Sequence, residues 1–390
     1  MTIEEQKYVR TCLSGDEAVA YAVKHANVDV IAAYPITPQT IMVEILSEFV
    51  HDGELDAEFV PVESEHTALS AAIGASLAGA RVFTATASQG LALMYEILYV
   101  ASSIRAPVVM ALANRALNLP LNIHCSHDDA YAARDSGWIQ LFAENVQEVY
   151  DLVLTAFRIA EDKRILFPVI VNLDGFILTH CVEPLNIWKE EYITEFLPPR
   201  EPVNPVNWEK PMTYGPVALP DYYMKIKRGQ YEAIRKVMPY IKEILSEYSR
   251  WSGRKYDILK MYGMEDAEYA FIVLGSTAGT LRDIIKKWRE KGRKVGVISL
   301  TVYRPFPVEE LRKVLAGLKA VAIMDRSHTY GGPAAQLYMD VATALYDLDE
   351  RPRLLNVIYG LGGRDFTPAD AEDAYQALMD PTKKEVWVSI

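Results

Sequence analysis

The feature that most constrains the fold of this chain is a series of apolar runs that do not alternate with polar residues. VDVIAAY (28–34), RVFTATAS (81–88), APVVMALAN (106–114) and FPVIVNLDG (167–175) are such runs, and helical patterns separate them. A strand with apolar side chains on both faces suits a parallel sheet, because helices cover both sides of such a sheet. The sequence therefore predicts an α/β fold built on a parallel sheet.

The chain divides into three segments by pattern. Residues 1–198 have the α/β pattern, including a strand that ends at Val62 and a helix of small residues over about 65–78. Residues 199–256 begin rich in proline and turn residues, which indicates an irregular connection, and continue with a helical pattern from about 224 to 256. Residues 257–390 return to α/β, so we expect two domains joined by a connecting segment.

Composition excludes several classes of function. The 390 residues are 50% hydrophobic with a formal net charge of −12, and no basic run offsets this charge, so nucleic-acid and anionic-membrane binding are not expected. The three cysteines, Cys12, Cys125 and Cys181, are too scattered for a disulfide framework or an iron–sulfur site within the chain. No apolar run reaches the roughly 18 residues of a membrane span, and we expect a cytoplasmic protein.

Tyr34-Pro35-Ile36-Thr37-Pro38 follows the first apolar run. The two prolines fix φ and remove N–H donors, so they predict a rigid, non-helical turn. Ligands of open parallel sheets bind at the carboxyl ends of strands, where Thr37 would offer a hydroxyl and an N–H. On spacing alone, an ordinary strand-to-helix loop is the preferred interpretation.

Val62-Glu63-Ser64-Glu65-His66 lies at the next strand end. Ser64 as an N-cap, with acidic residues in the first helical turn, explains both glutamates simply. The alternative is a semi-buried carboxylate at a strand tip that shares a proton with a ring nitrogen.

Arg115 follows the third apolar run, at a place where an arginine can hold a substrate carboxylate in a bidentate fork. A surface ion pair is the simpler alternative. The loop 124–129 after it contains two histidines and two aspartates, which we interpret as a polar loop and not as a metal site.

Two glycine-containing turns carry little specificity. LGSTAGT (274–280) resembles a phosphate-binding turn but lacks the G-x-G-x-x-G and Walker patterns, so it predicts a helix start with weak anion affinity. The segment 360–365 is glycine-rich, and its role stays open, as does that of the loop 124–129. The chain also has no Gly-Asp-Gly of the kind that binds magnesium and diphosphate in thiamine-diphosphate enzymes.

Taken in order, YPITPQT (34–40), VESEHTALSAAIGASLAGAR (62–81), TATASQGLALMYE (84–96) and ANRA (113–116) resemble the alpha subunits of multi-subunit pyruvate:ferredoxin oxidoreductases. LGS, YRPFP, DRS and YGLGGRDFT, further along, are similar to the second domain of those subunits. The resemblance implies a pyrimidine-type thiamine-diphosphate-binding domain (1–198), a connecting segment (199–256) and a transketolase C-terminal-like domain (257–390).

The resemblance also implies roles for individual residues. Glu65 matches the glutamate that hydrogen-bonds the aminopyrimidine ring, and Pro35, Ile36 and Thr37 match the positions that line the cofactor and the substrate. Arg115 matches the arginine on the side of the substrate carboxylate. Glu65, Thr37 and Arg115 are thus the expected catalytic residues, and no metal ligand is expected in this chain.

The implied reaction is the reversible, coenzyme A-dependent oxidative decarboxylation of pyruvate to acetyl-CoA with reduction of ferredoxin. Thiamine diphosphate would be shared with a partner chain: a beta subunit would hold Mg²⁺ and the diphosphate. Beta and delta subunits would hold the [4Fe-4S] clusters, and a gamma subunit would complete the complex. Branched-chain 2-oxoacids such as 2-oxoisovalerate are an alternative substrate, and a non-catalytic scaffold subunit or a nucleotide-dependent oxidoreductase is an alternative class. The missing glycine fingerprint counts against the last.

Overall fold

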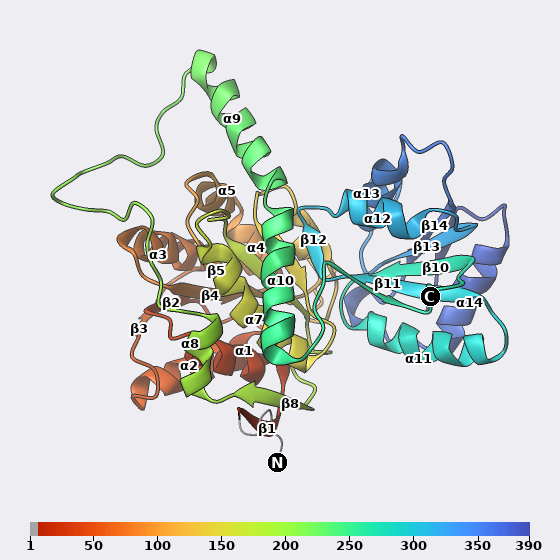
Figure 1. Ribbon diagram of the computed structural model, residues 1–390, viewed down its shortest axis with the longest axis horizontal. Coiled ribbons are helices and arrows are strands. Elements are labelled where there is room, and N and C mark those ends of the chain that lie inside the picture. Colours follow the sequence, from red (N-terminus) through yellow and green to blue (C-terminus); the bar gives the residue numbers. More distant parts are fainter. Residues whose placement is uncertain (1–6) are drawn as a thin grey trace.

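The computed structural model describes residues 7–390 and contains two α/β units side by side (Figure 1). The first unit is built on a seven-stranded sheet. Its strands are, in spatial order, β12 (Val302–Arg304), β6 (Ile139–Phe142), β7 (Val169–Asp174), β5 (Val108–Asn114), β4 (Val82–Thr86), β2 (Val30–Ala33) and β3 (Glu58–Pro61). Every pair is parallel except β12 with β6. The α/β prediction with a parallel sheet is confirmed.

Helices cover this sheet because its central strands are apolar at every position. All residues of β4, β5 and β7 are buried. The helices of this unit are α1 (Gly15–His25), α2 (Thr40–His51), α3 (Glu65–Ala78), α4 (Ser88–Leu93), α5 (Tyr95–Ser103), α6 (Asp128–Ala132), α7 (Val146–Glu161) and α8 (Glu190–Phe196). Helix α3 packs on β2 and β4, while α7 packs on β5 and β7.

A small antiparallel pair, β1 (Tyr8–Leu13) with β8 (Glu183–Trp188), closes the lower end of the first unit (Figure 1). The apolar-run pattern did not predict these two strands, because most of their residues are exposed or half-buried and they contain no unbroken apolar run.

The second unit has a six-stranded sheet. In spatial order it contains β15 (Glu385–Trp387), β14 (Arg353–Ile358), β13 (Ala320–Asp325), β10 (Tyr269–Val273), β11 (Val295–Leu300) and β9 (Leu259–Tyr262), of which only β9 is antiparallel to its neighbour. Its helices are α11 (Thr277–Glu290), α12 (Val308–Leu315), α13 (Gln336–Leu345) and α14 (Pro368–Met379), with a short 3₁₀ turn at Leu361–Gly363. Because β12 leaves this unit to pair with β6, the two units share a sheet edge.

The connecting segment differs from the single helix expected over about 224–256. It forms two helices, α9 (Pro220–Arg235) and α10 (Met238–Ser252). Pro239 lies in the first turn of α10, where its missing N–H does no harm, but a continuous helix would place it in the interior. Helix α10 packs against α7, whereas α9 extends away from the body of the molecule (Figure 1).

Among residues 7–390, no helix has the length and apolar content that crossing a membrane requires.

Candidate active site

Four neighbouring strands, β3, β2, β4 and β5, bring their carboxyl ends to one edge of the first sheet. Glu65 follows β3, the loop 34–38 follows β2, Gly90 follows β4 and Arg115 follows β5. Ligands of open parallel sheets bind at this edge. The sequence-predicted residues therefore lie on adjacent elements at the place where a ligand is expected.

Thr37 and Arg115 are in direct contact although 78 residues separate them in the chain. Arg115 Nη1 donates to the carbonyl oxygen of Thr37 at 2.9 Å, and Nε donates to the carbonyl oxygen of Asn122 at 3.2 Å. Burial lowers the pKa of Arg115, whose side chain is only slightly exposed. These two bonds use two of the five guanidinium N–H groups, so the others can bind a carboxylate.

The loop 34–38 is held to the sheet by hydrogen bonds, and part of it is exposed. The buried Gln39 amide nitrogen donates to the carbonyl oxygens of Tyr34 at 3.1 Å and Ala85 at 3.0 Å, which ties the loop to β4. Pro35 and Thr37 are exposed, and Ile36 is half-buried. The loop thus presents Pro35 and Thr37 on a fixed frame, while Pro38 is buried.

Glu65 is the first residue of α3 and is 7% exposed. The predicted N-cap is confirmed: the Ser64 hydroxyl accepts from the Thr67 N–H at 3.3 Å. Glu63 is exposed and accepts a hydrogen bond from the Thr67 hydroxyl. No residue in 7–390 donates a hydrogen bond to the Glu65 carboxylate. This buried acid can therefore accept a hydrogen bond from a ligand or from another chain.

Gly90 lies against Glu65, and the sequence patterns did not indicate it as a site residue. A Cβ atom at position 90 would lie 2.7 Å from Glu65 Oε1 and 2.9 Å from its Cγ, closer than real Cβ contacts come. The hydroxyl of Thr86 and both amide atoms of Gln89 are buried nearby in sequence without a partner among the described residues. A glycine in the first turn of a helix that follows a buried strand is the only sequence signal for this close approach.

The chemistry of these unpartnered groups can be compared with that of thiamine diphosphate. Glu65 offers a buried carboxylate, and Thr86 and Gln89 offer hydroxyl and amide groups that lack partners in the described part of the chain. A flat ring with several nitrogen atoms can satisfy such a set of donors and acceptors. The residues present fit the aminopyrimidine half of the cofactor.

Asp129, in the loop whose role the sequence left open, joins two strand ends. Its carboxylate accepts from the backbone N–H groups of Ser88 at 3.0 Å and Arg115 at 2.9 Å, and from the Asn114 amide at 3.1 Å. Burial raises the pKa of Asp129 to about 6, against the effect of these hydrogen bonds. One carboxylate therefore fixes both the start of α4, which holds Gly90, and the backbone of Arg115.

The same loop contacts the glycine-rich segment 360–365 of the second unit. The Asn122 amide donates to the Gly362 carbonyl at 3.1 Å, and the Gly363 N–H donates to the Cys125 carbonyl at 2.7 Å. Gly362 and Gly363 have positive φ values of 62° and 79°, and a Cβ atom at either would meet Asn122 or His124. The glycines thus allow the backbone of the second unit to approach the loop closely.

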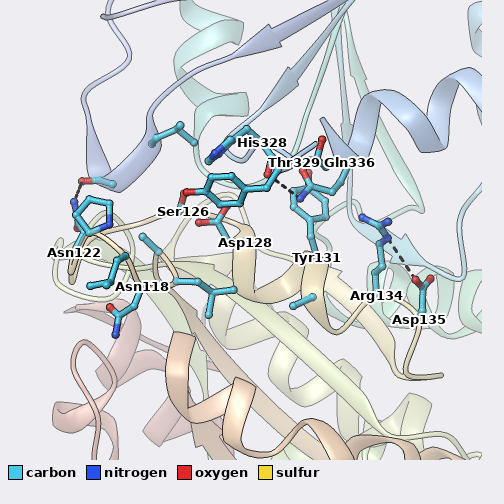
Figure 2. A pocket seen from close by; sticks show the side chains of 18 residues that line it. Asn118, Asn122, Ser126, Asp128, Tyr131, Arg134, Asp135, His328, Thr329 and Gln336 are labelled. Carbon is cyan, nitrogen blue, oxygen red and sulfur yellow. Dashed lines mark hydrogen bonds and ion pairs between the residues drawn. The ribbon is translucent and has the colours of Figure 1, made fainter. Parts of the chain in front are cut away.

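A cavity of about 800 Å³ lies between this loop and the second unit (Figure 2). Asn122, Ser126, Asp128 and Tyr131 line one side, and His328 lies on the other (Figure 2). The Ser327 hydroxyl donates to Asp128 Oδ1 at 2.6 Å, which links the two sides. Arg115 therefore sits at the border between the strand-end site and an interdomain cavity.

Three buried residues, Cys125, His127 and Asp174, place their side-chain ligand atoms within 4.8 Å of one another. This is an arrangement that a metal ion could use, but its atoms already form a hydrogen-bond network. His127 Nε2 lies 2.8 Å from Asp174 Oδ1, and the Ser276 N–H and hydroxyl donate to Asp174 Oδ2. Burial acts to raise the pKa of Asp174, yet His127 and the other neighbours hold it below its usual range.

The weak anion site predicted at the start of the 277–290 helix is therefore occupied by a carboxylate of the chain itself. Gly275, with φ of 70°, brings the turn against the Asp174 side chain. The contact joins β7 of the first unit to α11 of the second, and it stabilises the interface between the units.

Two family models match the chain. Residues 21–246 match the model described as pyruvate flavodoxin/ferredoxin oxidoreductase, thiamine diP-bdg, and residues 267–371 match pyruvate:ferredoxin oxidoreductase core domain II. Among curated proteins, the chain is 48% identical to pyruvate synthase subunit PorA of Thermotoga maritima over 96% of each chain. It is 42% identical to ketoisovalerate oxidoreductase subunit VorA of Pyrococcus abyssi, over 98% of this chain and 95% of that one.

Among solved structures, the fold is similar to that of a 2-oxoglutarate:ferredoxin oxidoreductase from Magnetococcus marinus with 2-oxoglutarate, coenzyme A and succinyl-CoA bound. The TM-score is 0.74 at 21% identity, and the match covers 95% of this chain and 65% of the other. At this identity the likeness concerns the fold alone.

Proposed function

The chain belongs to the pyruvate flavodoxin/ferredoxin oxidoreductase family, and on that premise we propose that it is the alpha-type subunit of a pyruvate:ferredoxin oxidoreductase. Its activity would be the coenzyme A-dependent oxidative decarboxylation of pyruvate to acetyl-CoA and CO₂, with the electrons passing to ferredoxin. The observation that supports this most is the Glu65 carboxylate at the strand-end site. It is buried, and no described residue donates a hydrogen bond to it.

Glu65 would hold a proton shared with a ring nitrogen of the aminopyrimidine. Gly90 leaves the space that this carboxylate occupies, and Thr86 and Gln89 offer further polar groups to the ring. Thiamine diphosphate, when bound, supplies a carbon nucleophile for the keto group and an electron sink for decarboxylation. The task of this chain is to orient the ring and to hold the proton at the correct nitrogen.

Arg115 and the loop 34–38 would bind the substrate. The free N–H groups of the Arg115 guanidinium suit a carboxylate, and its bond to the Thr37 carbonyl fixes it beside the loop. Pro35, Ile36 and Thr37 would line the cofactor and the acyl group. A short threonine side chain leaves room for a small acyl group, in agreement with pyruvate as the substrate.

The rest of the active site would lie on partner chains. The sequence has no Gly-Asp-Gly motif for magnesium and diphosphate and no set of clustered cysteines. We assign the Mg²⁺ and the diphosphate to a beta type subunit and the [4Fe-4S] clusters to beta and delta type subunits, with a gamma type subunit completing the complex. The 2-oxoglutarate:ferredoxin oxidoreductase of similar fold was solved with coenzyme A bound, which supports coenzyme A as the co-substrate here. All three cysteines are free thiols, which supports a reducing, cytoplasmic setting.

A second candidate substrate is a branched-chain 2-oxoacid, because the ketoisovalerate oxidoreductase subunit is also 42% identical over nearly the whole chain. The chemistry and the residue roles would be the same, and only the acyl group would differ. Turnover of pyruvate and 2-oxoisovalerate by the same reconstituted complex would separate the two.

The decisive experiment compares Glu65→Gln with Glu63→Gln in the complex assembled with its partner chains. Both acids lie at the start of α3, but only Glu65 is buried and unpartnered within the described residues. We expect Glu65→Gln to lower pyruvate-dependent ferredoxin reduction at least about a hundredfold, the scale of a lost acid–base group. Glu63→Gln should stay near wild type. Equal turnover of both variants and wild type would contradict the proposal.

A further inference from the structure

An arm of the chain, residues 203–229, projects from the first unit without burying its apolar side chains. It includes an irregular segment and the first half of α9, and Figure 1 shows it extending above α5. Every residue from Leu219 to Gly229 is exposed, and α9 has no buried residue along its length. Large apolar side chains are among the exposed residues, with Trp208 93% and Met224 80% exposed.

The exposed half of α9 has the pattern of a helix that docks. Leu219, Tyr222, Tyr223 and Ile226 recur at the spacing of one helix face, and they are between 41% and 64% exposed. An isolated helix of this length is marginally stable in water, and Gly229 in its interior lowers its stability further. Such a stripe is typical of a helix whose apolar face lies in the groove of another protein.

Both roots of the arm lie on the face formed by α3 and α5. The Val206 N–H donates to the Leu77 carbonyl at the end of α3 at 2.8 Å. At the other root, Tyr231 and Gln230 meet Tyr99 and Ser102 of α5 around a small cavity. The arm is therefore continuous with the face whose amino-terminal end holds Glu65.

That face is itself exposed and partly apolar. Leu93, Tyr95 and Val100 of α4 and α5 are 51%, 43% and 41% exposed. A second copy of this chain in that position would cover Glu65 with a protein that also lacks a magnesium and diphosphate motif. A chain that completes the cofactor site over Glu65 would contact α3 at its amino-terminal end, and the arm is rooted at the other end of the same helix.

We propose that the arm 203–229 clamps the partner subunit that holds the cofactor diphosphate, with the apolar stripe of α9 lying in an apolar groove that has an acidic rim. The charge of the arm supports this partner chemistry. The arm contains four basic and two acidic side chains, a net charge of +2 on a chain of net charge −12. Lys225 and Lys227 lie on either side of the stripe, because successive helix residues are rotated by about 100°, and there they can pair with acidic residues at the rim of the groove. The identity of the partner rests on the proposed function.

The test uses the full chain and the co-purified diphosphate-binding partner, with the double variant Tyr222→Asp/Ile226→Asp. Its matched control is Tyr346→Asp, which places the same charge at a 75% exposed tyrosine of the second unit. We expect the double variant to bind the partner at least tenfold more weakly, measured by titration, while the control binds as wild type does. Thermal unfolding of the free chain should be unchanged in both, because no residue of α9 is buried.

A photo-crosslinking phenylalanine analogue at position 222 identifies the occupant directly. Crosslinks to the diphosphate-binding chain support the proposal. Crosslinks to a second copy of this chain, or wild-type affinity of the double variant, overturn it. The readout is association, so it is independent of turnover: a complex that forms through the arm but converts no 2-oxoacid would refute the proposed function and leave the clamp intact.

Discussion

Gly90→Ala tests whether the position of Glu65 matters for the chemistry of the site. The added Cβ atom would lie 2.7 Å from Glu65 Oε1, whereas ordinary van der Waals contact begins near 3.4 Å. The same Cβ atom would also meet the Thr86 hydroxyl. The Glu65 and Thr86 side chains must therefore move by several tenths of an ångström, since the backbone of α4 is fixed by the bonds of Ser88 to Asp129 and Ala116. A shift of this size misaligns a hydrogen bond between the carboxylate and a ring nitrogen.

The expected magnitude follows from the value of that bond. A charge-assisted hydrogen bond contributes about 1.5–3 kcal/mol, so its loss corresponds to roughly a ten- to a hundredfold decrease in turnover. The effect on folding should be smaller. Overpacking costs about 1–3 kcal/mol, and the higher helix propensity of alanine offsets up to about 1 kcal/mol of this cost.

The assay is steady-state ferredoxin reduction by the reconstituted complex, with bound thiamine diphosphate and the unfolding free energy measured separately. Gly279→Ala is the matched control, because position 279 is also in the first turn of a helix and the nearest atom to its Cβ is an Arg282 nitrogen at 3.9 Å. We expect the control to keep wild-type turnover. Wild-type turnover of Gly90→Ala would show that the close packing of Gly90 on Glu65 has no catalytic role.

Three further predictions concern residues around the site and in the core. Arg115→Ala should raise the KM for pyruvate roughly ten- to a hundredfold without loss of thiamine diphosphate. Arg134→Ala, in the nearby loop, should keep the wild-type KM, and equal KM values for the two variants would contradict the placement of the substrate carboxylate at Arg115. Asp129→Asn should lower the unfolding free energy by about 1–3 kcal/mol and also raise this KM, because its NH₂ would face two N–H donors in either orientation, those of Ser88 and Arg115 or those of Asn114 and Ala130. Burial and, to a lesser degree, the charge of Lys24 lower the pKa of His25 to about 4, so the native state binds fewer protons than the unfolded state between pH 4 and 6.5. The contribution of His25 to the unfolding free energy should therefore fall by about 3 kcal/mol as the pH decreases through this window. Denaturant unfolding of wild type and His25→Gln at pH 6.5 and pH 4 measures it as the difference between the two chains, because all other titrating groups are common to both.

Features that depend on neighbours in the sequence were predictable. The helix over 65–78 begins and ends where expected, because the Ser64 cap and the left-handed Gly79 act within a turn of their own positions. The buried strands β2, β4, β5 and β7 were also predictable, since a sheet covered on both faces needs unbroken apolar runs. The strands β1 and β8, which lack such runs, were not, because their stability comes from their pairing with each other.

The sequence by itself thus determined the α/β class, the main strands and helices, and the strand ends at which Glu65, Thr37 and Arg115 would lie. Only the tertiary structure decided that Arg115 bonds to Thr37, that Gly90 packs on Glu65, and that Asp174 fills the anion site at the start of α11. It also decided that the apolar stripe of α9 stays uncovered within this chain. The physical reason is that capping, turn geometry and strand burial are local, whereas these contacts join residues tens of positions apart and arise only when separate elements pack together.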